Sequence, residues 1–445
     1  MAEAKAQPEI QNKTMNASAA TVRGWAALRN RWSADRNEMV ADQAVFHVVV
    51  FLTSALILFS RRPDAFLNAQ FYAEDGTFWY ADAYQLGWRC LFLPEAGYLS
   101  TLPRLIALFA QFFPLSLAPL IMNLAAIAVQ ICPVNLFLSS RYRAVSFGTR
   151  ALAVFLYLAL PNSSEVHANT TNVQWHLALL ACLVLLAKPG SRNWLFFDVP
   201  VLVLATLDGP LGIFLIPVAA VMAWTRRDLW SRALLAVLLP GAIIQAVTVA
   251  LSRSRVLGDT GASLAGFKII FGGQVVLGSL IGTRGLVGLT HLTGVSFYTL
   301  LAAIVGMLFL AYATVRGPVE LKLFVAFCLA VFMACLFRPL ADKPGFQWQI
   351  MAIPGNFGRY FFLPMLAFLA SLIWSVAGGR VSSAKYTALV ILLLMSIGIY
   401  KDWRYPEFLD LNFRETALQF EHAAPGTRVT FLVNPNWHMQ LTKKP

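Results

Sequence analysis

Two adjacent carboxylates, Glu74 and Asp75, are the residues of this chain whose chemistry most needs an explanation. They lie in the aromatic run 71–80, and Gly76 follows them and permits a turn. One carboxylate of such a pair can accept the proton of a hydroxyl group, while the other orients that group or holds a divalent cation such as Mg²⁺ or Mn²⁺. A solvated loop, or a helix N-terminus that favours acidic residues, explains the same pattern, and both interpretations stay open.

A second polar run extends from Asn162 to His176 and leads into an apolar segment. Helix capping and an interfacial tryptophan account for part of it, but it holds more amide groups than capping needs. Proteins bind sugars through amide groups and aromatic faces. We therefore expect contacts to a sugar, or to the molecule that carries a reacting hydroxyl group (the acceptor), from this run and from one arginine upstream. These residues are Asn169, Asn172, Gln174, Trp175, His176 and Arg104.

The composition predicts that these residues are positioned by membrane helices. The chain has 445 residues, is 58% hydrophobic with a mean hydropathy of +0.63, and is only 13% charged, about half the ~25% usual in soluble domains. The formal net charge is +13. Lys and Arg gather at the ends of apolar stretches, as the positive-inside rule requires, so this charge does not indicate nucleic-acid binding.

Threading these stretches through a bilayer gives an all-α polytopic protein with roughly eleven transmembrane helices. We expect a basic cytoplasmic segment at 1–43, a transmembrane domain at 44–400 and a small outer helix-strand cap at 401–445. The outer segment 61–113 carries the acidic pair and two interfacial helices. Whether 267–283 crosses the membrane stays open. The expected spans are 44–60, 115–139, 150–161, 173–187, 194–206, 210–224, 233–251, 296–314, 320–337, 360–378 and 386–400.

Positive charge on the outer side opposes the topology rule, so the basic residues that this threading places there need another reason. Arginine forks phosphate oxygens and lysine supplies a point charge. Attraction to anionic lipid headgroups, or snorkelling at span ends, is the alternative. We expect phosphate contacts from Arg338, Lys343 and Arg359, with Tyr360 as a hydrogen-bond donor.

This layout resembles the GT-C glycosyltransferases, integral membrane enzymes whose acidic motif lies in the first outer loop, where this chain has Glu74-Asp75-Gly76. The resemblance implies an inverting transfer of a sugar from a polyprenyl-phosphate donor to a cell-envelope glycan or lipid acceptor. It implies a first-loop base, with Asp75 favoured because Gly76 leaves its approach less hindered. It also implies basic residues on the donor phosphate, in a bacterial inner-membrane protein with a periplasmic site.

Two other classes share the size and composition of this chain. A flippase for lipid-linked sugars or polysaccharides should carry ionisable residues midway along its spans and show related halves. This chain keeps its charges near the span ends, which favours an enzyme. A non-enzymatic assembly subunit would not need the acidic pair.

Overall fold

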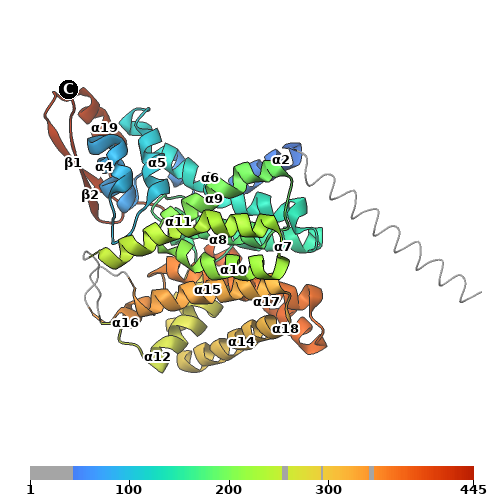
Figure 1. Ribbon diagram of the computed structural model, residues 1–445. Coiled ribbons are helices and arrows are strands. Elements are labelled where there is room, and N and C mark those ends of the chain that lie inside the picture. The colour runs from blue at the N-terminus through green and yellow to red at the C-terminus, as the bar shows by residue number, and fades with distance from the viewer. Residues whose placement is uncertain (1–43, 253–258, 292–293, 340–344) are drawn as a thin grey trace, which may run out of the picture.

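The computed structural model describes residues 44–252, 259–291, 294–339 and 345–445 (Figure 1). The expected cytoplasmic segment 1–43 and the expected phosphate ligand Lys343 lie outside these ranges.

Apolar helices dominate the described chain, and two consecutive strands close it. Two π-helices, η2 (Asp75–Tyr80) and η9 (Lys268–Leu277), continue directly into α-helices. The α-helices and strands are α2 (Ala44–Arg61), α3 (Asp64–Leu67), α4 (Ala81–Leu86), α5 (Thr101–Ala110), α6 (Ala118–Leu138), α7 (Phe147–Leu158), α8 (Val173–Leu186), α9 (Leu195–Leu207), α10 (Leu215–Arg226), α11 (Leu229–Leu251), α12 (Leu264–Phe267), α13 (Gly278–Thr290), α14 (Val295–Arg316), α15 (Val319–Phe337), α16 (Gln347–Met351), α17 (Gly358–Gly378), α18 (Ser382–Asp402), α19 (Phe413–His422), β1 (Arg428–Val433) and β2 (Trp437–Thr442).

Within the described ranges, eight helical segments are long and apolar enough to cross a membrane. All but one match spans expected from the sequence, and the exception is Leu264–Thr290. The other expected spans are helices too, but α7, α8 and α9 have only 12, 14 and 13 residues. At 1.5 Å per residue each is about 20 Å long, short of a ~30 Å hydrocarbon core. The structure therefore supports a multi-pass helical protein and does not confirm the count of eleven.

The segment Leu264–Thr290 makes no net crossing of the bundle. The far ends of α14 and α17–α18 meet where the Tyr312 hydroxyl contacts the backbone N–H of Arg380 at 3.1 Å. At the opposite end of the bundle, Lys268 contacts Ser296 at the start of α14. The segment therefore begins beside the start of α14, at the same end of the bundle where it ends. A break at Gly282, with φ of 72°, lets it turn.

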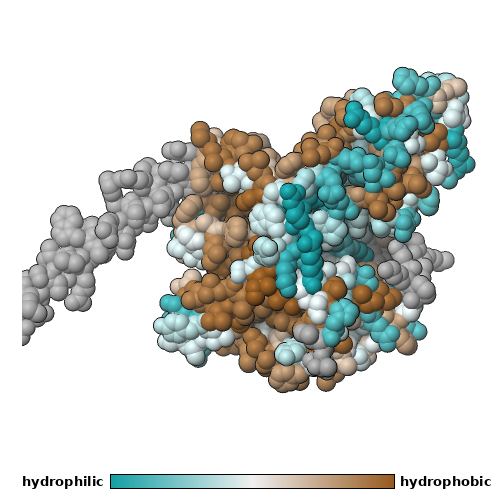
Figure 2. Space-filling model, turned by 180° about the vertical axis from the view of Figure 1, so that it is seen from behind, coloured by the Kyte–Doolittle hydropathy of each residue, from teal (hydrophilic) through white to brown (hydrophobic). Residues whose placement is uncertain are grey.

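The C-terminal cap, residues 401–445, packs on the segment 61–113. The Tyr405 N–H donates to the carbonyl of Arg61 at 2.9 Å, and β2 contacts η2 and α4. The start of α2 and the cap therefore lie at opposite ends of the bundle, as the threading predicts. The cap contains α19 and an antiparallel hairpin of β1 and β2, which agrees with the expected helix-strand unit. Figure 2 shows hydrophobic residues over much of the bundle and hydrophilic ones gathered over the lobe that contains the cap.

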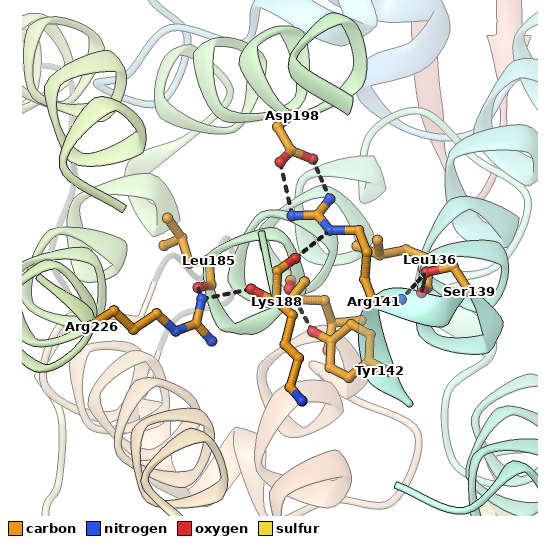
Figure 3. A network of polar contacts seen from close by, with 10 residues as sticks. Leu136, Ser139, Arg141, Tyr142, Leu185, Lys188, Asp198 and Arg226 are labelled. Atoms are coloured by element: carbon orange, nitrogen blue, oxygen red, sulfur yellow. Dashed lines mark hydrogen bonds and ion pairs between the residues drawn. The ribbon is translucent and has the colours of Figure 1, made fainter. Parts of the chain in front are cut away.

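Arg61 and Arg226 stabilise short helices by donating hydrogen bonds to the carbonyl groups at their C-terminal ends. Arg61 donates to the carbonyls of Leu158 and Leu160 after α7 at 2.7 and 2.9 Å. Arg226 donates in the same way to the last carbonyls of α8 (Figure 3). These carbonyls have no partner inside their own helix and attract cations, so guanidinium groups stabilise the helix ends.

At the end of the bundle away from the cap, Arg141 pairs with Asp198 through two bonds of 2.7 and 2.9 Å (Figure 3). Arg141 also donates to the carbonyl of Lys188 at 2.8 Å. Asp198 is fully buried, so the two charges compensate each other where water is excluded. This pair ties the turn after α6 to α9.

Candidate functional site

The acidic pair divides into one buried and one half-buried carboxylate. Asp75 is 1% exposed and opens η2. It accepts hydrogen bonds from the N–H and hydroxyl of Thr170 at 3.1 and 2.7 Å, and from those of Thr171 at 2.6 and 2.8 Å. Both Asp75 oxygens are engaged in joining the segment 61–113 to the loop before α8. Glu74 is half-buried, and its side chain is the one that remains accessible.

Two tyrosines and a guanidinium group lie within electrostatic reach of Glu74. Burial and the negative charge of Glu74 raise the pKa of Tyr98 above its ordinary value. Burial and the carboxylates of Glu165 and Glu74 do the same for the pKa of Tyr72. Both hydroxyls therefore stay protonated and can donate hydrogen bonds. Arg359 lies within electrostatic reach of Glu74 and of both tyrosines.

Arg359 is held by Glu165, a residue that was not expected in the site from the sequence. The Arg359 guanidinium pairs with Glu165 Oε1, and the backbone N–H of Arg359 donates to Oε2 at 3.0 Å. The side chains are 28% and 13% exposed. The guanidinium also lies 4.9 Å from the ring centre of Tyr360. Glu165 thus orients the guanidinium at the start of α17 and leaves part of it accessible.

Three residues expected to bind sugar instead build the loop that carries Glu165. Asn169 and Asn172 are buried, and their side-chain amides donate to the Glu165 carbonyl at 2.8 and 2.9 Å. The ring nitrogens of His176 contact the Tyr157 hydroxyl at 2.9 Å and the carbonyl of Val166 at 2.8 Å. These polar groups are engaged within the protein, so their observed part is to fix the loop.

Gln174 lies beside Tyr98, and Trp175 and Tyr360 lie beside Arg359. The side chain of Gln174 bonds the Tyr98 hydroxyl. It also comes so close to Gly209 that a Cβ there would lie 1.9 Å from its oxygen. Gly209 has a φ of 80°, which a residue with a side chain rarely adopts. The buried rings of Trp175 and Tyr360 have their centres 5.9 Å apart and form an aromatic wall.

The remaining expected residues stand apart from this group. Arg104 is 1% exposed, pairs with Asp82 at 2.6 Å and lies 4.9 Å from the ring centre of Trp79. That geometry stabilises the outer segment internally. Arg338 is the C-cap residue of α15, and its side chain is exposed.

The described residues do not fit a divalent cation at this site. Among them, no three His, Cys, Asp or Glu side chains converge. Asp75 spends both oxygens on Thr170 and Thr171, and Glu165 faces a guanidinium group. A cation such as Mg²⁺ would need carboxylate oxygens that these contacts already occupy.

Sequence reasoning missed Tyr72, Tyr98 and Glu165. Tyr72 is adjacent to the acidic motif, and Glu165 lies in the polar run that drew attention to its neighbours. A weak signal for both was therefore present. Tyr98 had none, because its place depends on how the outer segment folds over α8.

Comparison with known proteins adds no identification: no family model, no curated protein and no solved structure matches this chain.

Proposed function

We propose that the chain is a membrane glycosyltransferase of the GT-C type, with its site on the periplasmic side of a bacterial inner membrane. It moves a sugar from a polyprenyl-phosphate donor to a cell-envelope glycan or lipid, with inversion at the anomeric carbon. The observation that carries the proposal is a partly accessible carboxylate, Glu74, within electrostatic reach of an oriented guanidinium, Arg359, at the cap end of a membrane bundle.

Glu74 acts as the general base in this proposal. It accepts the proton of the acceptor hydroxyl as that oxygen attacks the anomeric carbon. The hydroxyl groups of Tyr98 and Tyr72 are available to donate hydrogen bonds beside Glu74. Asp75, favoured as the base from the sequence, becomes a positioning residue because four donors already occupy its oxygens.

Arg359 binds the phosphate that leaves with the polyprenyl chain. A guanidinium stabilises charge that develops on the departing oxygen, and its planar fork matches phosphate geometry. Glu165 holds Arg359 in place before the donor arrives, which lowers the entropy lost on binding. Tyr360 packs on the Arg359 guanidinium and Trp175 packs on Tyr360, so both rings support the guanidinium.

The test is release of polyprenyl phosphate from a panel of polyprenyl-phosphate hexoses by the purified protein in detergent, followed by mass spectrometry. Glu74→Gln should lower turnover by about 10²-fold or more, the scale of general-base loss. Glu415→Gln, on the exposed face of α19, is the matched carboxylate control and should keep wild-type turnover.

Wild-type turnover in Glu74→Gln would refute the assigned base. A protein that moves these lipids across vesicles without cleaving them would instead be the flippase that the composition also allows.

A further inference from the structure

We propose that the C-terminal cap positions Glu74 for the reaction, and that Asn434 is the positioning residue. This inference rests on the proposed function for its catalytic meaning. The cap is separated from the acidic pair by more than three hundred residues of sequence, yet it packs directly on the turn that carries the pair. A Cβ added to Gly76 would lie 3.0 Å from a methyl group of Val433.

Asn434 joins three segments of the chain. Its N–H donates to the carbonyl of Phe71 at 3.3 Å, and its own carbonyl accepts from the N–H of Ala73 at 2.6 Å. Its side chain accepts from the N–H of Leu409 at 3.0 Å and donates to the Leu409 carbonyl at 2.9 Å. Asn434 is 3% exposed, so its polar groups depend on these partners.

The backbone next to Glu74 needs such support. Ala73 has a φ of 46°, in the left-handed region where a Cβ crowds the backbone. Conformations of this kind persist only where surrounding contacts determine them. The bond from the Ala73 N–H to Asn434 is one of these contacts. Since Glu74 is the next residue, the conformation of Ala73 sets where the Glu74 side chain begins.

A stack of rings and guanidinium groups fixes the same turn from the other direction. The Tyr72 ring stacks on Phe408 with centres 5.3 Å apart and planes at 17°. The Arg62 guanidinium lies 4.4 Å from the centre of Phe408 and 5.5 Å from that of Tyr405. Arg61 lies 4.2 Å from Tyr405. The linker after α18 thus connects the end of α2 to Tyr72, the residue before Ala73.

The cap is therefore a clamp on the acidic turn, with Asn434 at its point of closure. Loss of the Asn434 side chain frees the linker at Leu409 and leaves the Asn434 backbone less constrained. The strained turn at Ala73 then relaxes, and Glu74 moves away from Arg359. Misplacement of a reacting group by about 1 Å can lower a rate 10²-fold.

The test compares Asn434→Ala with Asn436→Ala in the full chain. Asn436 lies in the same hairpin turn but is exposed, so it is the matched control. Amide hydrogen exchange is measured without substrate, followed by turnover and donor KM. For Asn434→Ala we expect at least tenfold faster exchange in 71–76, spans unchanged, and at least tenfold lower turnover with an unchanged donor KM.

A second substitution separates positioning from simple support of the fold. Glycine adopts positive φ without a steric penalty, so Ala73→Gly should restore much of the turnover of Asn434→Ala. Wild-type exchange in 71–76 of Asn434→Ala would overturn the proposal. Equal acceleration of exchange across cap and spans, with no rescue by Ala73→Gly, would also overturn it. Hydrogen exchange needs no substrate. If the proposed function is wrong, Glu74→Gln will keep wild-type turnover, while hydrogen exchange in Asn434→Ala still tests whether the cap holds the acidic turn.

Discussion

Replacing Asp75 by Asn tests whether this carboxylate positions the acidic turn or acts as the base. The change removes the charge and keeps the shape of the side chain. If Asp75 were the base, turnover should fall by about 10²-fold or more while the free energy of unfolding stays the same. If Asp75 joins two segments, as its contacts with Thr170 and Thr171 indicate, the free energy of unfolding should fall as well.

The expected loss of stability follows from the four hydrogen bonds. An amide nitrogen at Oδ1 would face three donors, whereas at Oδ2 it faces only the N–H of Thr170. The second orientation is therefore preferred. It replaces one charge-assisted hydrogen bond with a contact between two buried donors, which costs about 2–3 kcal/mol. Turnover should fall about tenfold through displacement of Glu74.

The assay is reversible unfolding in detergent by SDS titration, followed by tryptophan fluorescence, beside the turnover assay. Thr171→Ser keeps both donors to Asp75 and is the control, with stability and turnover close to wild type. Thr170→Val removes one donor, and its effect should not add to that of Asp75→Asn because both act on one network. Unchanged stability together with a 10²-fold loss of turnover would refute the positioning role and restore Asp75 as the base.

Two further predictions concern other parts of the molecule. Arg141→Ala leaves Asp198 buried without its ion-pair partner and should lower the free energy of unfolding by about 3–5 kcal/mol. The double variant Arg141→Met with Asp198→Leu should recover most of that loss. A double variant whose loss equals the sum of the two single-variant losses would contradict this prediction. A reporter active only in the cytoplasm, fused after Pro445, should be silent, and a signal there would reverse the proposed orientation.

Hydropathy alone was enough to find the membrane helices. The apolar stretches were recognisable from the sequence, and the expected spans are helical in the structure. The cap could also be predicted, because Pro425-Gly426 separates a short amphipathic run from an alternating one. The number of crossings could not be predicted in this way. Helices such as α7 and α9 are too short to span alone, and their depth depends on packing.

The site was predictable only in part, because its geometry depends on contacts between distant segments. Glu74 and Asp75 are neighbours with similar chemistry, and nothing local shows which is buried. The answer comes from Thr170 and Thr171, which lie almost one hundred residues later. Asn169 carries an amide that suits a sugar equally well, but the backbone of its own loop engages it.

The position of Arg359 bears on why positive charge is kept at this end of the bundle. An arginine that only anchors a span end in lipid headgroups should extend outward and find its partners in the headgroup region. Arg359 instead turns toward Glu165, and its own backbone N–H binds the same carboxylate. Two amides from Asn169 and Asn172 fix the backbone of Glu165 in turn. A guanidinium supported in this way is oriented before any ligand arrives, which is the arrangement that phosphate binding with little loss of entropy requires.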